Sequence, residues 1–208
     1  MSTRTRLSGL YAITPDDPQT SPLTAMVGAA LAGGVRLVQY RNKSAAPDLK
    51  HRQAAELLRL CRVHGARLII NDDLPLALAL DADGVHLGRD DGDLRAARAA
   101  LGPDKLLGVS CYADLGLAAS AAAAGADYLA FGSMYASATK PEAPPAPLAL
   151  LGEARRRYGL PIVAIGGITL SNAGQTVAAG ADLLAVVNDL FSAGDIAARA
   201  REYARLFA

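Results

Sequence analysis

An amide and two cations follow directly after a short apolar run near the start of the chain. Residues 35–38 read Val-Arg-Leu-Val, and Gln39, Arg41 and Lys43 come next. A buried strand that ends there would deliver all three side chains to one point. A guanidinium holds two phosphate oxygens, and an ammonium adds a point charge. The stretch therefore indicates a phosphate site, and a solvated surface segment is the alternative interpretation.

Carboxylates follow two later apolar runs in the same manner. One run ends in Asn71 and Asp72, and the next ends shortly before Asp91. If these runs are neighbouring strands, the two aspartates lie close enough to bind one Mg²⁺, with phosphate oxygens and water as its other ligands. Helix capping is the alternative, because aspartate is favoured at the start of a helix. We predict metal binding for Asp72 and Asp91, and capping for Asp73 and Asp93.

Apolar runs further along the chain end in residues suited to a second phosphate. One run ends in Gly166-Gly167 and another in Val187-Asn188. Paired glycines let backbone amides approach an anion, and the loops after the last two strands of a (β/α)₈ barrel commonly bind phosphate. Ser110, which ends another run, can also donate to an anion. These positions predict a monophosphate site apart from the first one.

The segment from Gly132 to Pro147 is a long loop in a chain whose other connections are short. It contains four prolines, two hydroxyl-bearing residues near its centre, and Lys140. Long loops in compact domains are often lids over a functional site. We predict a lid, and a proline-stiffened surface loop is the alternative.

The remaining reactive side chains do not indicate a nucleophilic mechanism. No Ser-His-Asp arrangement is recognisable around Ser110. Cys111 is interpreted as a small packing residue, and His86, inside an apolar run, as an interior residue. The candidate residues therefore point to binding and charge stabilisation.

A repeated pattern of glycine or aspartate before an apolar run indicates the fold. Copies at Gly34, Asp83, Asp127 and Asp182 follow Ala/Leu-rich stretches at separations of 49, 44 and 55 residues. Each interval accommodates two βα units, and four further apolar runs lie among the copies. The pattern predicts an α/β fold, a (β/α)₈ TIM barrel, as one compact domain over residues 1–208. An open doubly wound sheet is the alternative, but the turn after the first run lacks that fold's glycines.

The composition excludes several classes of function. A net charge of +1 over 208 residues gives no strong attraction to nucleic acid or membranes, and the chain has no tryptophan for base stacking. No apolar run is long enough to span a membrane, and no signal peptide is recognised. Cys61 and Cys111 form no CxxC motif, which favours a reducing cytoplasm. We predict a cytoplasmic protein with small-molecule partners; whether it forms a homo-oligomer stays open.

Together these motifs resemble the thiamine phosphate synthase family over nearly the whole chain. The resemblance is carried by Gln39-Tyr40-Arg41-Asn42-Lys43, Asn71-Asp72, residues 84–88 with Asp91, Gly108-Val109-Ser110, Thr139-Lys140-Pro141 and residues 165–168. It implies a Mg²⁺-dependent transferase that joins an aminopyrimidine diphosphate to a thiazole phosphate and releases diphosphate by a dissociative route.

The resemblance also implies roles for individual residues. Asp72 and Asp91 are expected to bind Mg²⁺, and the expected catalytic residues are Arg41, Lys43, Lys140 and Ser110. The expected substrate contacts are Gln39, Tyr40, Arg41, Asn42, Lys43, Asn71, Ser110, Ser137, Ala138, Thr139, Lys140, Gly167, Val187 and Asn188.

Two other functions remain open alongside the synthase. A thiazole tautomerase of the same superfamily would need no metal carboxylates and would be expected to have a histidine where this chain has Tyr112. A non-catalytic protein that binds a thiazole or pyrimidine phosphate is the other. Asp72 and Asp91 argue against the tautomerase, and the full set of charged residues argues against the non-catalytic binding protein.

Overall fold

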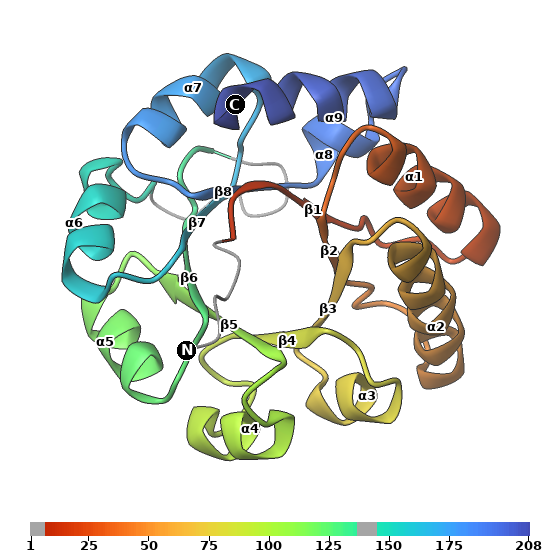
Figure 1. Ribbon diagram of the computed structural model, residues 1–208, viewed down its shortest axis with the longest axis horizontal. Coiled ribbons are helices and arrows are strands. Elements are labelled where there is room, and N and C mark those ends of the chain that lie inside the picture. The colour runs from red at the N-terminus through yellow and green to blue at the C-terminus, as the bar shows by residue number, and fades with distance from the viewer. Residues whose placement is uncertain (1–6, 137–144) are drawn as a thin grey trace.

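The computed structural model describes residues 7–136 and 145–208, which form a closed barrel of parallel strands (Figure 1). Each strand pairs with the next in the chain, and β1 (Gly9–Ile13) pairs with β8 (Leu183–Val186) to close the ring. The strands between them are β2 (Leu37–Tyr40), β3 (Arg67–Asn71), β4 (Gly84–Leu87), β5 (Leu106–Tyr112), β6 (Tyr128–Phe131) and β7 (Ile162–Ile165). The closed pairing confirms the predicted (β/α)₈ TIM barrel and excludes the open sheet.

A ring of helices surrounds the barrel and covers the outer faces of the strands (Figure 1). The helices are α1 (Thr20–Ala32), α2 (Pro47–Val63), α3 (Leu74–Ala79), α4 (Leu94–Leu101), α5 (Leu115–Ala123), α6 (Ala149–Tyr158), α7 (Leu170–Ala178), α8 (Asn188–Phe191) and α9 (Ile196–Ala204), with a final 3₁₀ turn, Arg205–Phe207. The Asp73 carboxylate accepts from the Leu76 N–H at 2.9 Å, and the Asp93 carboxylate accepts from the Ala96 N–H at 2.7 Å. Both aspartates are therefore helix caps, as predicted.

The repeated aspartates tie β4, β6 and β8 each to the strand before it. The Asp83 N–H donates to the Leu68 carbonyl at 3.1 Å, and the Asp83 carboxylate accepts from the Leu68 N–H at 2.8 Å. Asp127 and Asp182 make the same pair of bonds with β5 and β7. Each carboxylate satisfies a backbone donor at the start of a strand that would otherwise lack a partner. The first copy has Gly34 in this place and no carboxylate.

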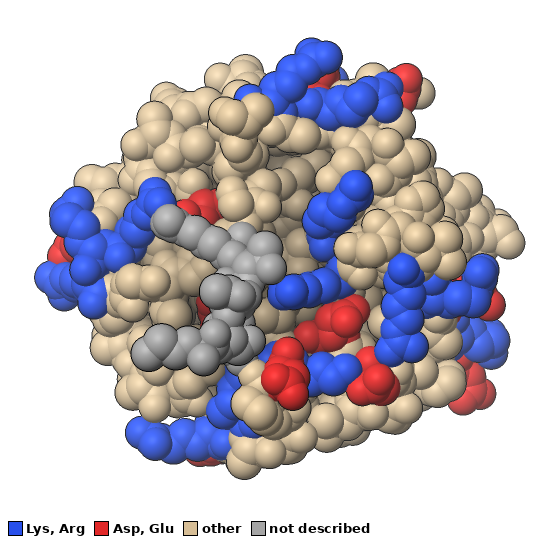
Figure 2. Space-filling model, in the orientation of Figure 1, with Lys and Arg blue, Asp and Glu red and all other residues tan. Residues whose placement is uncertain are grey.

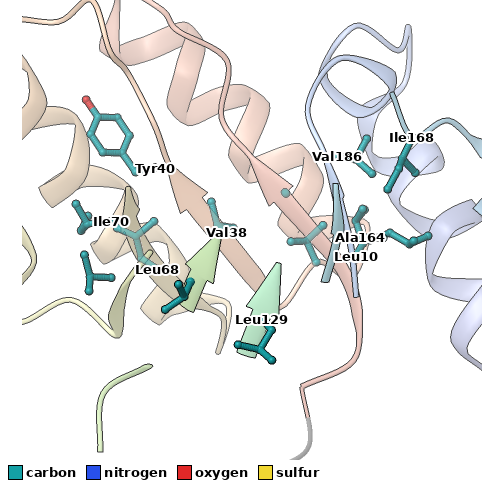
Figure 3. Packing of buried hydrophobic residues seen from close by; sticks show 14 of the residues in the cluster. Leu10, Val38, Tyr40, Leu68, Ile70, Leu129, Ala164, Ile168 and Val186 are labelled. Atoms are coloured by element: carbon teal, nitrogen blue, oxygen red, sulfur yellow. The ribbon is translucent and has the colours of Figure 1, made fainter. Parts of the chain in front are cut away.

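Side chains alternate between two hydrophobic clusters along each strand. In β1, Tyr11 and Ile13 face the barrel interior, whereas Leu10 and Ala12 face the helices. Figure 3 shows the outer cluster, with Val38, Leu68 and Ile70 on neighbouring strands. The interior is filled by Tyr11, Ile13, Leu37, Ile69, Leu106, Tyr128, Ala130, Val163, Leu183 and Ala185. Because the interior is packed, ligands can only reach the mouth of the barrel.

Charged side chains of both signs are interspersed on the face seen in Figure 2. This mixture agrees with the net charge of +1. Among the described residues, none of the helices combines the length and the apolar character needed to cross a membrane.

Candidate active site

The predicted cations and carboxylates meet at the carboxyl ends of β2, β3 and β4. Lys43 Nζ lies 3.3 Å from Asp72 Oδ2, and an Arg41 guanidinium nitrogen lies 2.9 Å from Asp16 Oδ1. The hydroxyl of Thr14 accepts from the Arg41 N–H at 2.9 Å and so fixes the backbone where β2 ends. Both cationic side chains are partly exposed, so an anion at the barrel mouth can reach them.

Asp72 and Asp91 come from different loops and lie against each other. The two carboxyl groups are near enough for the charge of Asp72 to act on Asp91, and the Lys43 ammonium acts on Asp91 as well. Burial raises the pKa of the Asp91 carboxyl, and the neighbouring Asp72 carboxylate raises it further. The Gly88 N–H, which donates to Asp91 Oδ2 at 2.7 Å, and the Lys43 ammonium act in the opposite direction. Two carboxylates in this arrangement repel each other when both are ionised, so the pair favours a cation.

The aspartate pair fits a Mg²⁺ ion. Mg²⁺ usually binds one or two carboxylates and takes its other ligands from water and phosphate oxygens. Across residues 7–136 and 145–208, no group of three or more His, Cys, Asp or Glu side chains is arranged to hold a metal. Asp72 has a φ of 61°, in the left-handed region, which costs aspartate about 1 kcal/mol. Backbone strain of this kind is concentrated at functional sites.

A chain of hydrogen bonds crosses the barrel interior from β2 to β5. Gln39 Nε2 donates to the Tyr11 hydroxyl at 2.8 Å, and the Tyr11 and Tyr128 hydroxyls lie 2.8 Å apart. Tyr128 contacts His86 Nδ1 at 3.1 Å, and His86 Nε2 contacts the Ser110 hydroxyl at 2.8 Å. The predicted interior position of His86 is confirmed. The Ser–His contact was not predicted, because it joins side chains from two different strands.

Burial lowers the pKa of the His86 imidazole from 6.5 to about 4. In the unfolded chain this imidazole binds a proton below pH 6.5, whereas in the folded chain it stays neutral until about pH 4. Stability is therefore lost as the pH falls through this window. We expect this to cost about 2 kcal/mol of unfolding free energy between pH 7 and pH 5. Urea unfolding at both pH values should show a smaller loss for His86→Gln.

The matched control for this measurement is the exposed His51, on α2. A His51→Gln variant should lose as much stability on acidification as the parent chain. Equal losses for the His86→Gln variant and the parent would contradict the assignment of the acid sensitivity to His86.

Tyr40 and Asn42 point away from the barrel mouth. The Tyr40 hydroxyl donates to Gln53 Oε1 on α2 at 2.8 Å, and Tyr40 lies with Ile70 on the outer side of the strands (Figure 3). Asn42 Nδ2 donates to the Asp17 carbonyl at 2.7 Å and to Gln53 Oε1 at 3.0 Å. Their hydrogen bonds hold the β1–α1 loop to α2 and so fix the backbone on both sides of Arg41.

A cavity of about 330 Å³ lies beside Asp72, between the ends of β2 and β3 and the helices α2 and α3. It brings together Lys43, Asn71 and Asp72, which were selected from the sequence, and adds Lys50 of α2. Lys50 was missed because a lysine in the first turn of a helix has the pattern of a solvated surface residue. The cavity is lined by Tyr40, Asn42, Lys43, Lys50, Ile70, Asn71, Asp72, Asp73, Pro75 and Leu76.

The paired glycines after β7 are packed against the loop that follows β6. Gly166 has a φ of 100° and Gly167 a φ of 63°. A Cβ on Gly166 would overlap Ser133, and one on Gly167 would overlap the Ala136 carbonyl. The glycines are therefore required by close packing as well as by any approach of an anion. Val187 and the exposed Asn188 follow β8.

The first part of the loop after β6 is hydrogen-bonded to this rim, and the described residues at its two ends are hydrogen-bonded to each other. The Tyr135 N–H donates to the Gly166 carbonyl at 3.0 Å, and the Ala146 N–H donates to the Ser133 carbonyl at 2.7 Å. The predicted contacts in the middle of the loop lie outside the described residues; they are Ser137, Ala138, Thr139 and Lys140.

A (β/α)₈ barrel with clustered cations, amides and carboxylates at the carboxyl ends of its strands is typical of TIM-barrel enzymes that act on phosphate esters. The profile of a family described as thiamine monophosphate synthase matches residues 10–190. The chain belongs to this family, whose members are transferases of thiamine biosynthesis.

Individual relatives agree with the family assignment. The chain is 58% identical to a thiamine-phosphate synthase of Methylobacillus flagellatus over 201 residues, which cover 97% of this chain and 96% of the relative. It is 57% identical to one of Aromatoleum aromaticum, with 98% of each chain covered. A thiamine phosphate pyrophosphorylase from Pyrococcus furiosus superposes with a TM-score of 0.86 at 32% identity, covering 97% of this chain and 96% of that one.

Proposed function

We propose that this chain couples an aminopyrimidine diphosphate ester to a thiazole phosphate, giving thiamine phosphate and free diphosphate. The meeting of Lys43, Asp72 and Asp91 at the barrel mouth, with Lys43 Nζ 3.3 Å from Asp72 Oδ2, is the observation that carries the proposal. Relatives at 48–58% identity are named thiamine-phosphate synthase. That name favours coupling over tautomerisation or binding without turnover.

The charged rim is suited to stabilising diphosphate as it leaves. Mg²⁺ held by Asp72 and Asp91 would neutralise part of the charge that develops on this group. Arg41 and Lys43 supply two further cations on the same side of the barrel mouth. Phosphate oxygens would replace Asp16 as the partner of Arg41 and would share Lys43 with Asp72. These charges stabilise the separated diphosphate more than the intact ester and so speed the loss of diphosphate.

The bond changes follow a dissociative order. The bond between the pyrimidine methylene carbon and the diphosphate oxygen breaks, and its electron pair leaves with diphosphate. The electron-rich aminopyrimidine stabilises the resulting cation, and the thiazole nitrogen donates its lone pair to form the new C–N bond. Gln39 and Asn71 offer amide donors and acceptors that suit the heterocycle. A thiazole phosphate held by Gly167, Val187 and Asn188 would face it from the other side of the same barrel mouth.

The direct test is incubation of the purified chain with both substrates, with and without Mg²⁺. Thiamine phosphate and diphosphate should form in equal amounts, and only when Mg²⁺ is present. Rearrangement of the thiazole phosphate alone would instead establish the tautomerase. Saturable binding of either substrate without any product would establish the non-catalytic protein.

Lys140 tests the proposed role of the loop after β6. A Lys140→Ala variant should lower kcat roughly 100-fold while changing KM much less, because its charge would act on the departing diphosphate. Steady-state kinetics with both substrates varied would measure the two effects. The matched control is Lys105→Ala, since Lys105 pairs with Asp81 on the outside of the barrel. Unchanged turnover in the Lys140→Ala variant would refute the role.

We also propose that the protein works in the cytoplasm. Cys61 and Cys111 are both free and buried, which fits a reducing compartment. Cells can be lysed directly into denaturant that contains a thiol reagent. Labelling of both Cys61 and Cys111 is expected, and would show that both thiols are reduced in the cell.

A further inference from the structure

The hydrogen-bond chain through the barrel interior connects two residues of the proposed substrate site. Gln39 lies at one end and Ser110 at the other, and Tyr11, Tyr128 and His86 lie between them. The three linking side chains come from β1, β6 and β4. Neither the sequence motifs nor the proposed mechanism assigns these linking residues a role.

The donors along this chain can be ordered from one end. Gln39 Nε2 is a donor, so the Tyr11 oxygen accepts there and the single Tyr11 proton goes to Tyr128. The buried Tyr128 O–H then needs an acceptor of its own, and His86 Nδ1, 3.1 Å away, is the partner left for it. An imidazole that accepts at Nδ1 carries its proton on Nε2 when it is neutral. This Nε2–H group donates a hydrogen bond to Ser110 Oγ.

The consequence appears at the exposed end of the chain. The Ser110 oxygen accepts a hydrogen bond from His86 Nε2–H, so the Ser110 hydroxyl hydrogen can donate to another group. Ser110 is partly exposed at the carboxyl end of β5, where the strands meet the barrel mouth. A hydroxyl in this state is a donor to an anion.

We propose that Tyr11, Tyr128 and His86 are positioning residues that hold Ser110 as a hydrogen-bond donor to the leaving diphosphate. This inference rests on the proposed function for the identity of the anion, but the hydrogen-bond order does not depend on it. The arrangement also assigns His86 to the tautomer protonated at Nε2.

The competing interpretation is a Ser–His pair in which His86 removes the Ser110 proton. That role needs an unprotonated Nε2, and a carboxylate that accepts from Nδ1 and stabilises the imidazolium. Here Nδ1 faces the Tyr128 hydroxyl. The hydrogen-bond chain therefore makes Ser110 a donor and not a nucleophile.

Packing holds the linking residues in one arrangement. The Tyr11 and Tyr128 rings meet edge to face, with centroids 5.8 Å apart, and the His86 ring stacks on Tyr128 with a centroid distance of 5.7 Å. Tyr11 and Tyr128 are almost completely buried. Gly108 opposes Tyr128 on β5, and a side chain at Gly108 would overlap the Tyr128 ring.

Nitrogen NMR of the full chain with ¹⁵N-labelled histidine tests the order directly. The chain has three histidines, and the signals of His86 can be assigned by their loss in a His86→Gln variant. At neutral pH the Nε2 of His86 should carry the proton and Nδ1 should not. A proton on Nδ1 would overturn the proposal. This readout needs no catalysis, so it stands or falls separately from the proposed function.

A double-mutant cycle tests the connection to the reaction. Tyr128→Phe should lower kcat about tenfold in the parent protein. The reason is that His86 Nδ1 loses the hydroxyl that donates to it, so the imidazole no longer holds Ser110 as a hydrogen-bond donor. In a Ser110→Ala background the same change should have little further effect. Equal effects in both backgrounds would overturn the role of Ser110 as the end point. Tyr158→Phe is the matched control, since it removes the bond from the Tyr158 hydroxyl to the Leu115 carbonyl, 2.6 Å, outside the barrel interior.

Discussion

An Asp91→Asn variant is expected to lose about 1,000-fold in coupling rate at physiological Mg²⁺. The substitution keeps the size of the side chain and removes one of the two carboxylates that would bind the ion. Asparagine can still accept from the Gly88 N–H, which donates to Asp91 Oδ2 at 2.7 Å in the parent chain. The loss therefore measures charge, which stabilises the leaving diphosphate through the metal. Product formation at a series of Mg²⁺ concentrations is the measurement.

The same variant should be at least as stable to heat as the parent when no metal is added. Burial and the Asp72 carboxylate both raise the pKa of the Asp91 carboxyl, so ionised Asp91 destabilises the folded chain at neutral pH. Removing that charge relieves the repulsion, so the variant gains stability while it loses activity. Asp93→Asn is the matched control, because Asp93 caps α4 and should affect activity little. An Asp91→Asn variant with the parent's response to Mg²⁺ would refute metal binding at this pair.

Much of the fold could be predicted because its signals are local. Each apolar run is short and bounded by a glycine or an aspartate, and Asp83, Asp127 and Asp182 mark the starts of alternate strands. A repeat at double βα spacing, together with right-handed connections, leaves few arrangements other than a closed barrel. The barrel in turn places the ends of successive strands at one rim. That topological step predicts that Lys43, Asp72 and Asp91 lie together.

The direction of each side chain was less well predicted, although part of it could have been. Residues alternate along a strand, so Gln39 inside the barrel requires Tyr40 outside it. Applying this rule would have separated Gln39 and Arg41 from Tyr40 and Asn42. The two outward residues hydrogen-bond to Gln53 on α2, which no motif connects with them.

The chain of hydrogen bonds in the barrel interior could not be predicted, because it depends on distances across the barrel. Tyr11 and Tyr128 belong to strands that are not neighbours, and their hydroxyls meet 2.8 Å apart only when the barrel has its observed width. The sequence shows one tyrosine in each of these two apolar runs, but nothing in it indicates that the two side chains meet. The contact between His86 and Ser110 has the same origin, since it depends on the register of β4 against β5.

A Gly108→Ala variant is expected to lose about 3 kcal/mol of unfolding free energy. Gly108 lies opposite Tyr128 in the pairing of β5 with β6, and a Cβ at this position would overlap the Tyr128 ring and its hydroxyl. The ring cannot move aside easily, because it is fully buried and is bonded to Tyr11 and His86. Any displacement also separates Tyr128 from His86, so the coupling rate should fall together with stability. Urea unfolding and kinetics on the same preparation would measure both effects.

Two further variants determine whether the overlap with Tyr128 is the cause. Gly174→Ala places the same methyl group in α7 with no atom within 4 Å, and should be neutral or stabilise the chain by up to about 1 kcal/mol. Tyr128→Ala is destabilising by itself, but it removes the ring that the new methyl group would meet. Adding Gly108→Ala to Tyr128→Ala should then cost little more, since the two changes act at one contact. A full additive loss in the double variant would place the constraint on Gly108 in the backbone of β5 instead of in the packing of Tyr128.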